Sequence, residues 1–434
     1  ILSFSPELFF RKDPEGLTVR PMKGTAARGR NAAEDYSNCR MLHLDPKNRS
    51  ENVMIVDLLR NDLARLIAGH PAPKVETLSL FDVASYESLL QMTSTIRATS
   101  SQEAMARLKL QDIFRALFPC GSITGAPKIR TMQIIDELEK DLRGVYTGAI
   151  GFFGPDGQAR FNVPIRTVRL RGSSGEMGIG AGITYDSVPE DEWEESLLKG
   201  RFLSEAKPVF YLFETMLWQK DKGYWLLQQH LDRLAGSADF FKFGCHLGLL
   251  REELERYQLQ LSGTCARVRL SLEKDGEIKI RHKGCSAPVL TSLPEIPQDC
   301  GEEFPTIAFA KERVDNRLSC FFHKTSQREL YDRYMQKAGE EGLFDYIFLN
   351  TAGEVTEGSF TNIFIHDGTR YSTPVVTSGL LDGVLRARLL AEGRGRVREK
   401  VLNADDIKCA KAIYLCNSVR GVVRVKLRPD EIAG

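Results

Sequence analysis

The sequence predicts a chain of mixed α/β (α+β) class that folds as two domains. Its 434 residues allow two or three domains, since one hydrophobic core rarely organises so long a chain. Strand-like runs and helical patterns alternate along the chain, which is typical of mixed folds. A break near residue 207 favours two domains, residues 1–207 and 208–434.

Composition narrows the function classes. Charged residues make up 27% and the formal net charge is +1, so neither nucleic acid nor an anionic membrane is an expected partner. No apolar run reaches the ~18 residues of a membrane helix. The nine cysteines form no C-x-x-C pair, so we expect a reduced, cytoplasmic enzyme. The chain begins without Met on the strand-like residues 1–4, and we expect further residues in front of them.

The first stretch that suggests chemistry is RPMKGTAARGR, residues 20–30, which follows the strand-like residues 17–19. Pro21 and the glycines restrict the backbone around Lys23 and let it approach a ligand. If this stretch faces a cleft, Lys23 could be a nucleophile. Taken alone, however, the pattern favours an exposed lysine in a glycine-rich turn. Upstream, Glu7 lies between a proline and an apolar strand. Burial would raise its pKa and suit a general acid, whereas an edge-strand glutamate would face water.

Two helical segments carry acidic residues that could bind a metal ion. Residues 51–67 predict an amphipathic helix entered from Ser50, with Glu51 in the first turn, where the helix dipole favours a carboxylate. In a later helix, Glu192, Glu195 and Lys199 recur on one face. That face is either a salt-bridged surface or a set of oxygen ligands for Mg²⁺ shared with Glu51.

Two glycine-rich stretches predict ligand contacts. FPCGSITGAPK, residues 118–128, leads into a predicted helix, and the backbone N–H groups at such a start bind anions. The spacing is not that of a nucleotide-binding P-loop, so a carboxylate is the expected ligand. Residues 178–184, GIGAGIT, predict a strand that a ligand approaches closely because side chains are absent.

These segments together resemble the chorismate-utilising enzymes, the family of the anthranilate, isochorismate and aminodeoxychorismate synthases. The motifs SPELFF, PMKGTAARGR, ENVMIVDLLRNDLAR, FPCGSITGAPKIRTMQIIDELE, RGVYTGAIG and GAGITYDS with EWEES occur in the family's order between residue 1 and about 206. The resemblance implies a large α/β sandwich with the site in a central cleft, of which this chain holds the C-terminal portion.

The resemblance also implies roles for individual residues. Glu51 and Glu195 would hold Mg²⁺, with Glu192 as an additional candidate, and Glu7 would be the general acid. The substrate would contact Thr124, Gly125, Tyr146, Arg166, Gly182 and Lys199.

Lys23 distinguishes members of this family. The aminodeoxychorismate synthases carry lysine in a P-[IM]-K-G-T motif, whereas the anthranilate-forming enzymes carry a small residue there. The amine would attack C2 of chorismate as the C4 hydroxyl leaves, and ammonia would then displace it at C4. This chain departs from several relatives at Gln91, where they have a histidine.

The second half begins with strand-like residues 213–217 and 224–227, a helix from His230 and a hairpin over residues 267–280. Lys324 ends an aromatic run just before a predicted helix, residues 327–338. A buried lysine beside aromatic rings has the lowered pKa that a Schiff base needs, although lysines at helix entrances are also common without any such role. A strand at 345–350 and a turn and strand at 353–364 follow.

HLDRL, FFHKT, EVTEGSFTNIF, GLLDGVLR and LCNSVRGV resemble the fold-type IV pyridoxal phosphate enzymes over residues 209 to about 430. That family includes branched-chain and D-amino-acid aminotransferases and 4-amino-4-deoxychorismate lyase. The resemblance implies a two-subdomain fold that binds pyridoxal 5'-phosphate, with Lys324 as the lysine that attaches it and Glu357 paired with its ring nitrogen. The phosphate would bind Arg233 and donors near Thr361, Asn362, Asn417 and Ser418.

The two resemblances suggest a bifunctional enzyme of 4-aminobenzoate synthesis, a folate precursor. The first domain would aminate chorismate at C4, and the second would release pyruvate from the product, with Lys324 taking the C4 proton. Ammonia would come from a separate glutamine amidotransferase subunit, and a homodimer through the second domain is expected by analogy. Two alternatives remain open. One is an anthranilate- or isochorismate-forming domain with an aminotransferase, and the other is a C-terminal half that acts only as a scaffold.

Overall fold

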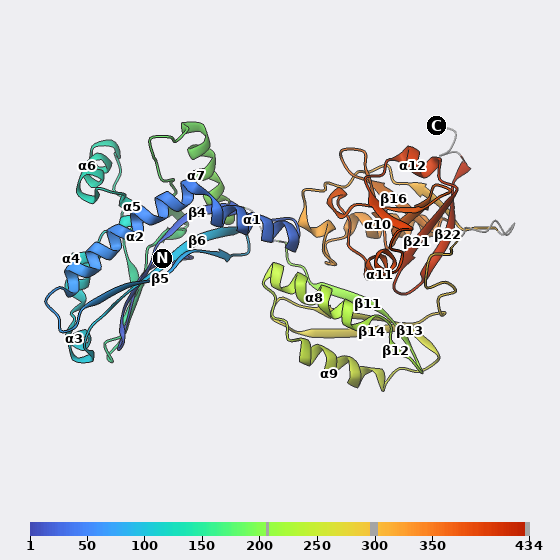
Figure 1. Cartoon of the computed structure of the whole chain (residues 1–434), viewed down its shortest axis with the longest axis horizontal. Coiled ribbons are helices and arrows are strands. Elements are labelled where there is room, and N and C mark those ends of the chain that lie inside the picture. The colour runs from blue at the N-terminus through green and yellow to red at the C-terminus, as the bar shows by residue number, and fades with distance from the viewer. Residues whose placement is uncertain (205–207, 296–302, 430–434) are drawn as a thin grey trace. The chain divides into compact units, whose positions relative to one another are not determined.

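A computed structural model describes residues 1–204, 208–295 and 303–429, and its contacts divide the chain into two compact units of mixed α/β structure (Figure 1). Unit 1 contains Ile1–Arg28 and Tyr36–Pro208, and unit 2 contains Gly29–Asp35 and Val209–Gly434. The predicted domain boundary at 207/208 adjoins residues 205–207, which lie outside the described residues. Among the helices of the described ranges, none is both long and apolar enough to cross a membrane.

An antiparallel sheet of seven strands forms the centre of unit 1. Its order is β4-β6-β3-β2-β8-β7, with β5 also paired to β6. Unit 1 also contains a three-stranded antiparallel sheet of order β1-β9-β10. The strands are β1 (Leu2–Ser3), β2 (Leu8–Asp13), β3 (Gly16–Arg20), β4 (Met22–Ala27), β5 (Lys74–Ser85), β6 (Leu89–Thr99), β7 (Ile150–Phe153), β8 (Ala159–Asn162), β9 (Thr167–Arg171) and β10 (Ser174–Met177).

The long helix α2 (Pro46–Ile67) covers part of this sheet and contacts β4, β5 and β6 (Figure 1). It buries Ile55, Leu59 and Leu63 in a core shared with the strands. The predicted helix over residues 51–67 is confirmed, but its predicted start at Ser50 is wrong. Asp45 accepts a hydrogen bond from the Asn48 backbone N–H (2.7 Å) and caps the helix. Glu51 therefore lies beyond the first turn.

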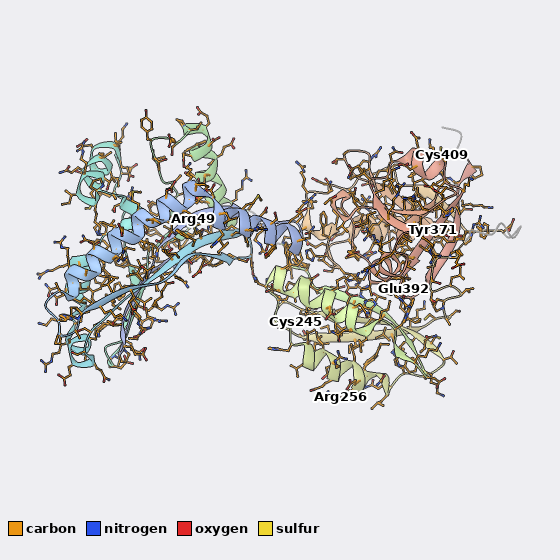
Figure 2. The ribbon with its side chains drawn as sticks, in the orientation of Figure 1. Arg49, Cys245, Arg256, Tyr371, Glu392 and Cys409 are labelled. Atoms are coloured by element: carbon orange, nitrogen blue, oxygen red, sulfur yellow. The ribbon has the colours of Figure 1, made fainter. Side chains whose placement is uncertain are left out.

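Arg49 of α2, labelled in Figure 2, lies over the ring of Phe81, 4.5 Å from its centre, and this contact joins α2 to β5.

The other helices of unit 1 are shorter than α2. The remaining helices are α1 (Ala32–Leu44), α3 (Gln102–Arg107), α4 (Leu110–Leu117), α5 (Gly121–Thr124), α6 (Lys128–Leu138) and α7 (Pro189–Ser204).

The glycine-rich residues 178–184 are not a strand, so that prediction is wrong. β10 ends at Met177, and the chain runs irregularly from there to α7. The ring of Tyr146 lies so close to Gly178 that a Cβ there would be 2.4 Å from it. Glycine is required at this position by the close approach of an aromatic ring rather than by strand pairing.

Unit 2 begins with a four-stranded antiparallel sheet of order β12-β11-β13-β14. The helices α8 and α9 pack on one face of this sheet around the buried residues Met216, Leu234 and Val268. The predicted hairpin over residues 267–280 and a helix containing His230 are confirmed. The predicted strand over residues 224–227 is wrong beyond Tyr224, because β12 ends there and α8 begins at Leu227, before the predicted helix start at His230. The bounds of these elements are β11 (Leu212–Gln219), β12 (Gly223–Tyr224), α8 (Leu227–Phe241), α9 (Leu247–Gln258), β13 (Cys265–Leu272) and β14 (Ile278–Gly284).

A larger mixed sheet of eight strands follows, in the order β17-β16-β15-β22-β21-β18-β19-β20. The pairs β15–β16, β15–β22 and β19–β20 are parallel. Its strands are β15 (Thr306–Phe309), β16 (Asp345–Leu349), β17 (Val355–Gly358), β18 (Asn362–His366), β19 (Tyr371–Pro374), β20 (Val397–Lys400), β21 (Ala412–Asn417) and β22 (Gly421–Leu427). The helical segments are η1 (Ser319–Phe321), α10 (Glu329–Glu340), η2 (Val376–Ser378), α11 (Val384–Glu392) and α12 (Ala404–Lys408).

Lys324 lies where the two sheets of unit 2 meet. The chain between η1 and α10 pairs with the start of β11, since Phe213 N–H donates to the Lys324 carbonyl (3.0 Å) and Ser326 N–H to the Tyr211 carbonyl (2.9 Å). Hydrogen bonds to the start of β11 thus fix the backbone at Lys324. The chain that follows it forms α10 and then enters the large sheet as β16.

Candidate active sites

Lys23 lies on a β-bulge rather than in an open turn. Met22 pairs with Thr93 and Thr25 with Gln91, so Lys23 and Gly24 together face the single residue Met92 on β6. Gly24 has a φ of +96°, in the left-handed region that favours glycine. Bulges redirect side chains and are frequent beside active sites. The bulge directs Lys23 toward residues 178–184, where a Cβ at Gly182 would be 3.0 Å from the lysine Nζ.

Glu7 is buried next to Lys23. Only 3% of it is exposed, and burial raises its pKa to about 7. A hydrogen bond from the Ser122 hydroxyl and the positive charge of Lys23 partly oppose that rise. The edge-strand alternative, with the carboxylate facing water, is therefore wrong. Glu7 exchanges its proton near neutral pH, which suits a general acid or base.

The irregular segment 178–184 gathers two further predicted residues. Lys199 donates from its Nζ to the Gly180 carbonyl (3.1 Å) and forms an ion pair with Glu195 (2.7 Å). The Tyr146 hydroxyl would lie 3.1 Å from a Cβ at Gly180. Tyr146, Lys199 and Lys23 thus surround one stretch of backbone.

Thr124, Gly125 and Arg166 are not connected to this cluster by any hydrogen bond of the described residues. The Thr124 hydroxyl donates to the Cys120 carbonyl (3.3 Å), and Gly125 ends the short helix α5 with a φ of +96°. Arg166 is half-buried with a φ of +48°, and burial lowers its pKa. Their predicted contacts with substrate stay predictions.

The predicted metal ligands lie on two helices, Glu51 on α2 and Glu192 and Glu195 on α7. Glu192 accepts a hydrogen bond from the Ser187 hydroxyl (2.7 Å), and Glu195 pairs with Lys199. In the described ranges no three acidic, histidine or cysteine side chains form a group that could hold a metal ion, so Glu51, Glu192 and Glu195 do not make a triad. Mg²⁺ usually takes one or two carboxylates with waters and substrate oxygens. The oxygen donors of Glu51 and Glu195 fit that chemistry, and their pairing stays a prediction.

In unit 2, the seven residues predicted to bind the cofactor line one cavity of about 740 Å³. They come from helix α8, the segment before α10, β17, the β17–β18 turn and the end of β21. The residues are Arg233, Lys324, Glu357, Thr361, Asn362, Asn417 and Ser418.

Lys324 lines this cavity with its Nζ 5.0 Å from the centre of the Phe213 ring. Burial, helped by the nearby charges of Arg233 and Arg328 and opposed by the carboxylates of Glu214 and Glu357, lowers the pKa of Lys324 to about 7. A large fraction of the amine is therefore neutral at pH 7, the form that reacts with a carbonyl group.

Glu357 faces the same cavity and is buried among hydrogen-bond donors. It accepts from the Tyr331 hydroxyl (3.1 Å), the Asn362 amide (3.2 Å) and the Leu381 backbone N–H (3.2 Å). Burial raises its pKa to about 7 against these hydrogen bonds. A cationic ring nitrogen placed beside it would favour the ionised carboxylate.

Arg233 is held by a residue that the sequence analysis missed. Glu214, which is 1% exposed, accepts from Arg233 Nε (2.8 Å) and Nη2 (2.7 Å) and contacts His230 Nδ1 (2.7 Å). Burial would raise the pKa of Glu214, but Arg233 and His230 outweigh it and hold the pKa below its ordinary value. The signal was a glutamate inside the apolar strand that carries Phe213, opposite the His–x–x–Arg spacing of α8.

A second missed residue, Asp345, fixes the turn between β17 and β18. It is fully buried and accepts from the Ser359 N–H (2.9 Å) and from the Thr361 hydroxyl (2.7 Å). The Thr361 hydroxyl is therefore engaged within the protein, and the turn that carries Thr361 beside the cavity is held by a buried carboxylate. Close packing also fixes Gly383, where a Cβ would lie 1.9 Å from Asn362 Oδ1.

The donor set of this cavity fits pyridoxal phosphate. Glu214 and the Asp382 carbonyl use three of the five N–H groups of Arg233, so two can meet a phosphate. Lys324 and Glu357 supply the amine and the carboxylate that such a cofactor needs.

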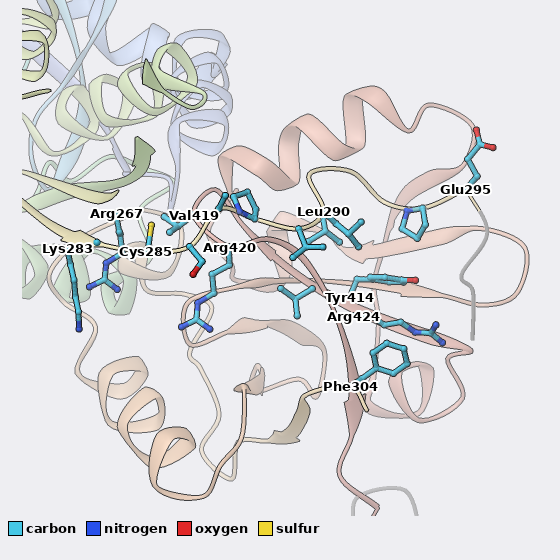
Figure 3. A pocket seen from close by; sticks show the side chains of 18 residues that line it. Arg267, Lys283, Cys285, Leu290, Glu295, Phe304, Tyr414, Val419, Arg420 and Arg424 are labelled. Atoms are coloured by element: carbon cyan, nitrogen blue, oxygen red, sulfur yellow. The ribbon is translucent and has the colours of Figure 1, made fainter. Parts of the chain in front are cut away.

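A larger cavity, of about 1030 Å³, lies in the same unit (Figure 3). Arg267, Lys283 and Arg420 line both cavities, and Tyr414, Arg424 and Phe304 line the far part of the larger one. Lys324 and Glu357 are absent from its walls. The groups that titrate near neutral pH therefore mark the smaller cavity as the chemical site.

Comparison with known proteins assigns a family model to each half of the chain. Residues 1–205 match the family described as chorismate binding enzyme, and residues 211–427 match the family described as amino-transferase class IV.

Curated relatives match the first half. The chain is 44% identical over 211 residues to an aminodeoxychorismate synthase from Arabidopsis thaliana, which covers 48% of this chain and 22% of that protein. It is 40% identical over 209 residues to an anthranilate synthase component 1 from Haloarcula marismortui, covering 48% of this chain and 41% of that protein. The chain thus spans less than half the length of either relative.

Solved structures match the second half. A protein assigned as an amino-acid aminotransferase from Mesorhizobium loti shares 33% identity with a TM-score of 0.44, covering 50% of this chain and 100% of that one. A protein assigned as a 4-amino-4-deoxychorismate lyase from Legionella pneumophila shares 23% identity with a TM-score of 0.42, covering 50% and 83%.

Replacing Glu214 is expected to weaken the phosphate site. Glu214→Gln removes the buried charge that orients Arg233, and breaking a buried ion pair by removing one partner costs about 3–5 kcal/mol of folding stability. We expect the affinity of the apo-protein for pyridoxal phosphate to fall at least about tenfold, which corresponds to about 1.4 kcal/mol. Fluorescence titration of the apo-protein measures this directly.

Glu255→Gln, at an exposed position of α9, is the matched control and should leave the affinity unchanged. Equal pyridoxal phosphate affinity in Glu214→Gln and the wild type would contradict the role assigned to Glu214.

Proposed function

Because the chain belongs to the class IV aminotransferase family over residues 211–427 and carries a chorismate binding enzyme domain over residues 1–205, we propose that it makes 4-aminobenzoate in two steps. Unit 1 aminates chorismate at C4 to give aminodeoxychorismate. Unit 2 removes pyruvate from that product. The observation that carries the proposal is the bulge that presents Lys23 beside Glu7 and Gly182.

In the first step the amine nitrogen of Lys23 forms a bond to C2 of chorismate. Both ring double bonds shift, and the C4–O bond breaks as Glu7 gives its proton to the departing hydroxyl, so that water leaves. Ammonia then bonds to C4, both double bonds shift back, and the C2–N bond to Lys23 breaks. Splitting one difficult substitution into two displacements is the advantage of a covalent nucleophile.

In this scheme Mg²⁺ at Glu51 and Glu195 would neutralise the ring carboxylate of chorismate. Thr124 and Gly125 would contact that carboxylate. Tyr146, Arg166 and the backbone at Gly182 would hold the enolpyruvyl carboxylate, and Lys199 offsets the negative charge of the acidic residues.

In the second step Lys324 removes the proton at C4 and the bond between ring C3 and the enolpyruvyl oxygen breaks, so pyruvate leaves and the ring becomes aromatic. Bound pyridoxal phosphate would supply an electron sink for the pair left by this proton loss. Glu357 would keep its ring nitrogen charged, and Arg233 with Thr361, Asn362, Asn417 and Ser418 would hold its phosphate. A lysine that titrates near pH 7 is suited to accept the C4 proton.

We propose two partners for this activity. Ammonia would come from a glutamine amidotransferase subunit, because the proposed reaction consumes ammonia. A homodimer through unit 2 is the second.

Lysine substitutions separate the two steps. With chorismate, ammonium and Mg²⁺, we expect the wild type to release 4-aminobenzoate, Lys324→Ala to accumulate aminodeoxychorismate, and Lys23→Ala to form neither. Chromatography of the products measures all three. Anthranilate as the wild-type product would rule out the first step, and 4-aminobenzoate from Lys324→Ala beyond spontaneous decay would rule out the second.

The second domain also has a direct cofactor test. Purified protein mixed with pyridoxal phosphate should develop a visible absorbance band that is absent in Lys324→Ala. A protein that stays colourless would instead support the scaffold alternative.

The amination rate should depend on pH through Glu7. Its pKa of about 7 means that the carboxyl is protonated below pH 7 and loses its proton as the pH rises through that value. With unprotonated ammonia held constant, we expect kcat to fall about tenfold per pH unit above pH 7. Glu7→Gln should lower kcat by about 10²–10⁴-fold.

Glu15→Gln, an exposed carboxyl close in sequence, serves as control and should follow the wild-type profile. A wild-type profile that stays flat through pH 7 would show that Glu7 is not the acid.

A further inference from the structure

Gln91 lies opposite the bulge that carries Lys23, and both ends of its side-chain amide are engaged there. Its Nε2 donates to the Gly24 carbonyl (2.9 Å), and its Oε1 accepts from the Thr25 hydroxyl (3.2 Å). Gln91 is 8% exposed, whereas Gly24 is half-buried and Thr25 is exposed, so the amide reaches from the core to the edge of the bulge. The two contacts fall on the two residues that follow Lys23 in the chain.

The bulge needs such a partner. An extra residue in one strand disrupts the local ladder and leaves backbone groups without their usual cross-strand partners. Gly24 is half-buried, and the Gln91 amide gives its carbonyl a side-chain hydrogen bond in place of a cross-strand one. Asn48 of α2 closes the other side, since a Cβ at Gly24 would be 3.1 Å from its side chain.

We infer that Gln91 is a positioning residue that fixes the bulge and thereby aims Lys23 at the reacting carbon of chorismate. This inference rests on the proposed function, because it takes Lys23 as the nucleophile. The side-chain hydrogen bonds of Gln91 go to the Gly24 carbonyl and the Thr25 hydroxyl, both in the bulge. Its effect on the reaction passes through the direction of the Lys23 side chain toward Gly182.

The orientation matters because a covalent nucleophile must meet its carbon at near-attack distance. A misplacement of ~1 Å by a change outside the reacting groups can cost about 10²-fold in rate. A lysine side chain has many rotamers. Fixing the backbone that carries it restricts the positions that its amine can reach. This chain achieves that with an amide, which can donate and accept at the same time.

The test uses the full chain and the variants Gln91→Met and Gln91→Glu. Methionine has a similar length but neither donates nor accepts strongly, and glutamate keeps the acceptor for Thr25 while losing the donor to Gly24. We expect both to lower kcat for aminodeoxychorismate formation by about 10²-fold with little change in the KM of chorismate. Thr93→Val, on the same strand and equally buried, should leave both constants unchanged.

A second measurement does not depend on activity. Acetic anhydride labelling of the free protein, read by peptide mass spectrometry, gives the reaction rate of Lys23 relative to Lys199. We expect this ratio to change severalfold in Gln91→Met and to stay at the wild-type value in Thr93→Val. An unchanged ratio together with wild-type kcat would overturn the role of Gln91.

The two measurements also distinguish the inference from the function on which it rests. If the wild type itself makes no aminodeoxychorismate, the proposed function fails. The labelling ratio then still decides whether Gln91 orients Lys23. If the wild type is active but thermal denaturation shows that Gln91→Met is unfolded, Gln91→Glu is used instead. Its kcat and the Lys23 labelling ratio of its folded fraction then decide whether Gln91 orients Lys23.

Discussion

Removal of charged groups from water shapes both candidate sites. Glu7 in unit 1 and Lys324 and Glu357 in unit 2 are taken out of water, and burial is the largest cause of each pKa shift. In all three cases the shift brings the pKa to about 7, where a group can both hold and release a proton at neutral pH. Glu214 shows the opposite result, because Arg233 and His230 compensate its burial and keep it charged. Glu214 stays ionised because two cationic or hydrogen-bonding partners contact it directly, whereas burial dominates at Glu7, Lys324 and Glu357.

Backbone geometry supplies the second requirement, which is access. Three backbone features give this access. The bulge presents Lys23, and the glycines at 178–182 and at 383 have no side chain where Tyr146, Lys23 or Asn362 comes close. Such positions leave backbone groups that must be satisfied from elsewhere. Gln91 and Asp345 fill that need, one with an amide and the other with a carboxylate. Both residues act behind the groups expected to meet the ligands. Gln91 stands out in the sequence only as a departure from the histidine of several relatives, and Asp345 does not stand out.

Much of the fold and part of the site follow from local patterns. The helices of α2 and α8, the hairpin of β13 and β14, and the strand β16 have the periodicity and turn residues that the sequence shows. The seven residues that the motif resemblance implied for the cofactor line one cavity, and their roles stay a prediction. The start of α2 was misplaced because Asp45 caps the helix before the apolar stripe begins. Residues 178–184 were misjudged because glycines satisfy both a strand and an irregular segment, and only the ring of Tyr146 decides between them.

The sequence by itself determined the two families, the order of the two domains and which lysines are candidates for covalent chemistry, because these depend on residue type and spacing. Tertiary structure decided the state of those residues. Whether Glu7 faces water or the core, whether Lys324 titrates near pH 7, and which residues hold Arg233 and the Lys23 bulge all depend on groups distant in the chain. Desolvation and hydrogen bonding act across space, so no local pattern can specify them.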